Sequence, residues 1–120
     1  CSHVYYNFPL VVDEEELGCS RDEVFNALVG EGVPIGRGYP NLYLLPMYQN
    51  KIAYGSKGFP WVSEIYKGKV SYNKGICPVA EELNNIIMGI GLCSYEYCNE
   101  EIDSVIVAFK KVWANLDSLS

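Results

Sequence analysis

The sequence predicts a small α+β fold, with helices packed on one face of an antiparallel or mixed sheet. Two apolar, β-favouring stretches lie near residues 3–12 and 86–92, and stretches with helical periodicity separate and follow them. No internal repeat is present. With 49% hydrophobic and 20% charged residues, the 120-residue chain can form one core, so we expect a single domain over residues 1–120.

The first two elements follow from local residue patterns. Residues 3–12 are rich in Val, Tyr and Phe, which indicates a strand, and Pro9 within it suggests a sheet edge or a bulge. The acidic cluster at 13–16 is interpreted as a solvated loop. Ser20 and Glu23 then form a Ser-x-x-Glu capping box, which predicts a helix from Ser20 to about Gly30.

The middle of the chain, residues 32–76, is predicted to be a long irregular segment. It is dense in glycine and proline and holds most of the tyrosines together with Trp61. Structureless loops of this length are uncommon and tend to be functional or disordered. The many aromatic residues favour a function.

Three elements are expected after this segment. Pro78 suits a first helical position, so residues 77–85 are predicted to form a second helix, followed by a buried strand at 86–92. Asn99 is the expected cap of a last helix of about five turns, which should lie across the sheet. Its apolar positions are Ile102, Val105, Ile106, Phe109, Val112, Trp113 and Leu116.

Composition argues against several classes of function. A net charge of −6 repels nucleic acid, and no apolar run approaches the roughly 20 residues of a spanning helix, so we expect neither nucleic-acid nor membrane binding. The chain starts Cys-Ser-His, without an initiator Met or a signal peptide, which suggests a fragment. Five irregularly spaced cysteines favour free thiols and a cytoplasmic location.

Metal binding and cysteine catalysis are weakly supported. Cys77, Cys93, Cys98 and His3 are the ligand types zinc prefers, but the spacing is poor and no second close pair exists, so no metal is expected. A Cys/His nucleophilic pair would need His3, the only histidine, and no thiol is singled out as its partner. A small cysteine-dependent enzyme is therefore the least supported hypothesis.

Two further features allow both a functional and a structural interpretation. The Gly-Arg-Gly-Tyr-Pro stretch at 36–40 could cradle a phosphate, or it could be a turn with a solvated Arg37, which we favour. A group of aromatic residues could line a sugar site, form a protein interface or cover a small core. Its members are Tyr39, Tyr43, Tyr48, Tyr54, Trp61 and Tyr66.

The order of the segments resembles the C-terminal region of sugar aminotransferases of the DegT/StrS type, nearly from end to end. The pieces that carry the resemblance are His-Val-Tyr-Tyr-Asn-Phe at 3–8, Ser-Arg-Asp-Glu-Val-Phe at 20–25, Ala-Leu at 27–28, Gly-Val-Pro-Ile at 32–35, Gly-Tyr-Pro-Asn-Leu-Tyr at 38–43 with Pro46, Cys-Pro-Val-Ala-Glu-Glu-Leu at 77–83, and the terminal segment 100–112. The chain departs from the family at Gly-Ile-Gly-Leu, residues 89–92, where relatives often show Leu-Pro.

This resemblance implies a fold-type I aminotransferase that uses pyridoxal phosphate on a keto-sugar linked to a nucleotide, or on a keto-cyclitol. The large N-terminal domain with the Schiff-base lysine would be missing here, so no catalytic residue is assigned, no cofactor is expected on this chain, and the chain alone should be inactive. The full-length enzyme would be a homodimer. The resemblance implies substrate-side positions at Tyr39, Tyr43, Pro46, Tyr48 and His3. The alternative is a stand-alone carbohydrate- or protein-binding module without a cofactor.

Overall fold

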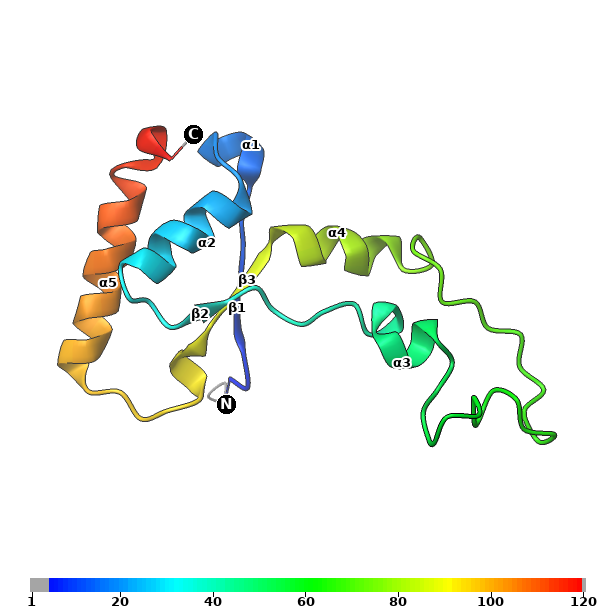
Figure 1. The fold of residues 1–120 in the computed structure, drawn as a ribbon. Coiled ribbons are helices and arrows are strands. Elements are labelled where there is room, and N and C mark those ends of the chain that lie inside the picture. Colours follow the sequence, from blue (N-terminus) through cyan, green and yellow to red (C-terminus); the bar gives the residue numbers. More distant parts are fainter. Residues whose placement is uncertain (1–4, 120) are drawn as a thin grey trace. The chain divides into compact units, whose positions relative to one another are not determined.

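The computed structural model describes residues 5–119 and shows an α+β fold, which confirms the predicted class. The chain forms two compact units. The first contains the described residues up to Gly38 and those from Asn85 onward, and the second contains Tyr39–Asn84. Figure 1 shows the sheet together with α2 and α5 in the first unit and α3 in the second.

The first unit contains a three-stranded antiparallel sheet. Its strands are β1 (Phe8–Val11), β2 (Ile35–Gly36) and β3 (Ile87–Ile90), in the order β1-β3-β2. Gly89 lies opposite Pro9 on one side and opposite Gly36 on the other. Pro9 is thus on an edge strand, where its missing N–H removes no inner hydrogen bond. The edge position predicted for Pro9 is confirmed.

The helix α2 (Arg21–Gly30) begins as its capping box predicts. The backbone N–H of Ser20 donates to the Glu23 carboxylate at 2.6 Å, and the backbone N–H of Glu23 donates to the Ser20 hydroxyl at 3.3 Å. These two reciprocal bonds satisfy donors at the helix start. The predicted start of this helix is confirmed.

The acidic cluster before α2 is helical, so its interpretation as a loop was wrong. It forms the short helix α1 (Glu14–Leu17). Asp13 caps it by accepting a hydrogen bond from the Glu16 backbone N–H at 3.1 Å, and Gly18 ends it at a φ of 72°. These are ordinary start and stop signals, and they outweigh the repulsion among the acidic side chains.

The bounds of other predicted elements also require correction, including those of the last helix and the last strand. The last helix, α5 (Asn99–Trp113), is capped by Cys98, whose backbone N–H donates to Glu101 at 2.9 Å, and Asn99 is its first helical residue. The helix ends at Trp113, so Leu116 lies in a separate 3-10 turn. The strand expected at 86–92 spans only 87–90, because the chain turns at Gly91, whose N–H donates to the Pro34 carbonyl.

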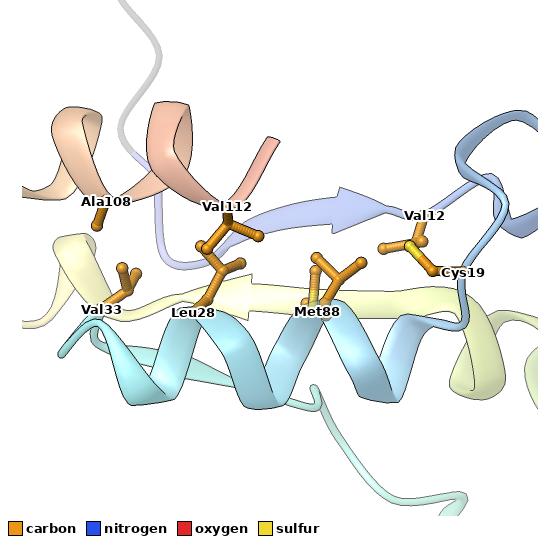
Figure 2. Packing of buried hydrophobic residues seen from close by; sticks show 8 residues of the cluster. Val12, Cys19, Leu28, Val33, Met88, Ala108 and Val112 are labelled. Carbon is orange, nitrogen blue, oxygen red and sulfur yellow. The ribbon is translucent and has the colours of Figure 1, made fainter. Parts of the chain in front are cut away.

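The core of the first unit lies between the sheet and the helices α2 and α5. Val24, Leu28 and Met88 are completely buried. Figure 2 shows Leu28 of α2 and Val112 of α5 converging beside the central strand, which carries Met88. The buried cluster consists of Val12, Cys19, Val24, Leu28, Val33, Met88, Ala108 and Val112. Helices therefore pack on one face of the sheet, as predicted.

Charged groups connect the elements around this core. The buried Arg21 donates from Nη1 to the Ile87 carbonyl at 3.1 Å, so the start of α2 is joined to the start of β3. Lys111 of α5 forms an ion pair with Glu31, which follows α2, at 2.7 Å. Burying a charge is costly unless it is paired or hydrogen-bonded, and the bond to Ile87 together with an ion pair to Asp22 at 3.0 Å offsets that cost.

The second unit has little regular structure. It contains a 3-10 turn at Leu42–Leu44, the helix α3 (Pro46–Gln49) and most of α4 (Pro78–Ile86). Pro78 is the first residue of α4, so the predicted start of this helix is confirmed. From 32 to 76 no helix or strand exceeds four residues, which agrees with the predicted irregular segment.

Candidate ligand pocket

The irregular segment folds around three aromatic rings, those of Tyr48, Trp61 and Tyr72. The ring centroids of Tyr48 and Tyr72 lie 5.2 Å apart, and that of Trp61 lies 6.3 Å from Tyr48 and 6.1 Å from Tyr72. Both Trp61 pairs are T-shaped and the tyrosine pair is tilted by 47°. No pair is stacked face to face, and all three side chains are half-buried.

Hydrogen bonds hold this aromatic cluster in place. The indole N–H of Trp61 donates to the Tyr72 hydroxyl at 3.1 Å. The side-chain amide of Gln49 donates to the backbone carbonyls of Tyr43 and Tyr72, each at 2.7 Å. Because one bond joins the Trp61 and Tyr72 rings and another fixes the Tyr72 backbone, these two rings can form a prepared surface for a ligand.

Local sequence explains how α3 places Tyr48 and Gln49. Pro46 has the backbone angle of a helix start, and it is the first residue of α3. The helix ends in a Schellman motif, in which the N–H of Ile52 donates to Met47 and the N–H of Lys51 donates to Tyr48. Lys51 has a φ of 52°, in the left-handed region where glycine is usual.

A tight hairpin then brings the chain back to the cluster. The backbone N–H of Ala53 donates to the Phe59 carbonyl at 3.0 Å, and Tyr54 forms a β-bridge with Phe59. Gly58 has a φ of 78°, and an added Cβ would lie 3.1 Å from Val62, so glycine suits this position. The Tyr54 ring packs against Phe59, with ring centroids 6.2 Å apart.

The rings border an open pocket of about 560 Å³. This volume lies within the usual range for small-molecule sites, about 300–1,000 Å³. Its lining comprises Tyr48, Gln49, Lys51, Trp61, Val62, Tyr66, Gly68, Lys69, Val70, Ser71, Tyr72 and Asn73. Two lysines and no carboxylate are among these residues. The pocket therefore combines aromatic surface with positive charge.

A second polar contact connects Tyr43 to α4. The Tyr43 hydroxyl donates to Glu81, and the Gly75 backbone N–H donates to the same carboxylate oxygen at 2.6 Å. Desolvation and the Glu81 carboxylate raise the pKa of Tyr43 to about 12, whereas the bond from Tyr43 lowers the pKa of Glu81. Tyr43 is therefore neutral and Glu81 ionised near neutral pH.

The structure separates the residues that the sequence grouped together. Tyr48 lines the pocket. The Tyr43 hydroxyl is hydrogen-bonded to Glu81, and the Tyr43 backbone carbonyl accepts a hydrogen bond from Gln49 beside the aromatic cluster. Pro46 is exposed at the start of α3. Tyr39 is 62% exposed, and His3 lies outside the described residues.

Of the wider aromatic group, Trp61 and Tyr66 line the pocket and Tyr54 lies in the hairpin. Sequence reasoning missed Tyr72 and Gln49. Tyr72 has the same aromatic character as the others, so it could have been included, but nothing local marks Gln49.

The structure also bears on the phosphate-cradle and metal-site hypotheses. Arg37 donates to the Asp22 carboxylate at 3.0 Å, and its guanidinium lies 3.9 Å from the centre of the Phe25 ring. These contacts occupy the Arg37 guanidinium and argue against a phosphate cradle. The predicted turn with a solvated arginine was also wrong, because Gly36 lies in β2 and Arg37 is held by Asp22 and Phe25. Within residues 5–119, no three His, Cys, Asp or Glu side chains are grouped so that they could hold a metal ion. Cys19, Cys77, Cys93 and Cys98 are free thiols.

The pocket does not fit pyridoxal phosphate by itself. That cofactor needs a lysine for the Schiff base and an acidic or basic partner for its ring nitrogen. Lys51 and Lys69 are solvent-exposed, and the lining contains no carboxylate or arginine. We therefore derive no chemical step through this cofactor on the described residues.

No protein-family model matches this chain, and no curated protein matches it at a significant level. The aminotransferase resemblance consequently stays a prediction. Among the described residues, no helix has the length and apolar character needed to cross a membrane.

Proposed function

We propose that the chain is the C-terminal small domain of a pyridoxal-phosphate-dependent sugar aminotransferase, contributing a substrate-side wall. The substrate is a keto-sugar linked to a nucleotide, or a keto-cyclitol. A larger domain outside this chain carries the cofactor and the Schiff-base lysine, and the full-length enzyme is a homodimer. A cytoplasmic location belongs to the same proposal and is supported by the free thiols.

The hydrogen bond between Tyr43 and Glu81 is the observation that carries this proposal. Tyr43 belongs to the Gly-Tyr-Pro segment, and Glu81 belongs to the Cys-Pro-Val-Ala-Glu-Glu segment, 38 residues further on. These are two of the pieces that resemble the family. Their direct contact supports a common wall, which a shared role toward a substrate would require.

Exposed apolar surface on the first unit also supports the proposal. A domain that normally packs against a larger one should expose apolar side chains when described alone. Val11 on the edge strand is 64% exposed. An apolar groove of about 290 Å³ also runs beside α5. It is lined by Leu10, Ile90, Leu92, Ile102, Val105, Ile106, Phe109 and Lys110.

The decisive experiment uses the full-length protein that contains this chain. We expect a visible Schiff-base absorbance band that borohydride bleaches, and an amino group transferred from glutamate or glutamine to a keto-sugar. The 120-residue chain alone is the matched control and should show neither. A full-length protein that is purified with added pyridoxal phosphate and still lacks the band contradicts the proposal.

A stand-alone binding module is the second candidate function. It is favoured by one observation: every residue lining the pocket lies between Tyr48 and Asn73, so the pocket needs no other domain. The two candidates differ in a simple measurement. Sugar binding by a natural protein that has no Schiff-base band would support the module and not the aminotransferase.

A further inference from the structure

The pocket combines aromatic rings with lysine side chains, and this combination points to a particular ligand. We infer that it binds a sugar ring carrying a phosphate or a carboxylate, with the ring against the aromatic cluster and the anion near Lys51 and Lys69. The inference does not depend on the aminotransferase proposal, because residues 48–73 supply the whole pocket.

The aromatic side chains provide the surface for the ring. Sugars bind proteins by placing their CH faces on aromatic rings and their hydroxyls on polar groups. Tyr48, Trp61 and Tyr72 are not stacked face to face, and an edge-to-face pair covers a face of only one of its two rings, so not every ring face is occupied within the cluster. Ser71 and Asn73 add hydroxyl and amide groups to the lining.

The charge of the pocket lining favours an anionic sugar over a neutral one. Residues 51–74 contain five lysines, at 51, 57, 67, 69 and 74, and only one acidic residue, Glu64. Two of these lysines line the pocket. An ammonium group attracts a phosphate or carboxylate, and no carboxylate in the lining opposes this attraction. A neutral sugar can accept hydrogen bonds from these ammonium groups, but it lacks the attraction between opposite charges.

The backbone of Lys51 is a second, independent indication. Its φ of 52° places a long side chain where helices usually end with glycine. Residues kept in such conformations cluster at ligand sites, where the side chain is needed. Glycine would satisfy the turn more easily, so a lysine at this position, which lines the pocket, is consistent with a role for its side chain.

The size and the charge distribution favour a small anion over a long polyanion. A pocket of about 560 Å³ holds a ligand of one or two rings. The chain as a whole carries a net charge of −6, which disfavours association with a nucleic-acid polyanion.

The binding test uses the 120-residue chain with Trp113→Phe, so that Trp61 is the only tryptophan and its fluorescence reports on the pocket. Glucose 1-phosphate, glucuronate and glucose are titrated separately, with inorganic phosphate and a thymidine oligonucleotide as further probes. The Trp61 indole N–H resonance of the unmodified chain provides a second measurement if Trp113→Phe does not fold.

We expect saturable binding of at least one sugar anion, about tenfold tighter than glucose. The tighter of the two acids identifies the anion as phosphate or carboxylate. Lys51→Gly and Lys69→Gln should each weaken this binding at least threefold. The matched control is Lys57→Gln, which removes a lysine of the same segment that does not line the pocket, and it should bind as the parent does.

Four results would overturn the inference. The first is that no probe gives saturable binding. The second is that glucose binds as tightly as both acids, and the third is that inorganic phosphate alone binds as tightly as the sugar phosphate. The fourth is that the oligonucleotide binds more tightly than either acid, which would indicate a site for single-stranded nucleic acid. None of these results bears on the Schiff-base test of the full-length enzyme.

Discussion

Truncation of Leu28 tests whether the first unit is held by the core between the sheet, α2 and α5. Leu28 is completely buried within the cluster that includes Met88 and Val112. Leu28→Ala removes three carbon atoms, which costs about 2.4 kcal/mol at about 0.8 kcal/mol per buried carbon. The cavity left behind adds to this, and measured leucine truncations in cores reach about 3–5 kcal/mol. We expect a loss of about 3 kcal/mol.

Urea unfolding followed by far-UV circular dichroism measures this loss. With a slope of about 1.5 kcal/mol per molar, a typical value for a small domain, the midpoint should fall by about 2 M urea. Val29→Ala is the matched control, because Val29 is the next residue of α2 and is 47% exposed. It should cost well under about 1 kcal/mol. Equal losses for the two variants would refute the assigned core.

Three further predictions follow from local contacts. Ser20→Ala removes a capping acceptor and should lower the free energy of unfolding by about 1 kcal/mol in the same urea assay, with Ser104→Ala nearly unchanged. The pKa of Glu81 is lowered in the folded chain, so it contributes stability that is present above its ordinary value of 4.5 and is lost as pH falls through the folded value. The pKa of Tyr43 is raised, so it contributes stability that is present below pH 10 and is lost as pH rises toward about 12. Thermal melts across pH should therefore show an alkaline decline that is smaller in Tyr43→Phe than in the parent, while the remainder is expected from Cys19, because burial raises the pKa of its thiol. A decline of equal size in the parent and the variant would contradict the contact. Lys51→Gly should raise the unfolding free energy by about 1 kcal/mol, since it relieves a left-handed backbone, and a loss of stability would show that the lysine side chain packs structurally.

Local signals in the sequence predicted the starts of α2 and α4 correctly. The reciprocal bonds of Ser20 and Glu23 involve residues three apart, so the sequence pattern contains the whole interaction. Pro78 likewise begins α4 through its own backbone angle. The acidic helix α1 carried equally local signals in Asp13 and Gly18, but its charge was taken as a mark of solvation. Net charge was a poorer guide there than capping.

Features that depend on distant partners could not be predicted in this way. The strand β2 has only two residues and exists because it pairs with Gly89 and Ile90, more than fifty residues away. In the pocket, Tyr48 was predicted, yet its neighbour Tyr72 comes from a stretch without regular structure. Gln49 matters because of two backbone carbonyls that only the folded chain brings within its reach.

The position of β3 in the middle of the sheet affects how the protein is made. Because β1 and β2 both pair with β3, neither has its partner until residues 87–90 have left the ribosome. Contacts between distant parts of a chain form slowly, and unpaired strands invite association with other chains during the delay. Pro9 lacks a backbone N–H, so β1 offers one fewer hydrogen-bond donor for non-native pairing with another chain before β3 has been synthesised.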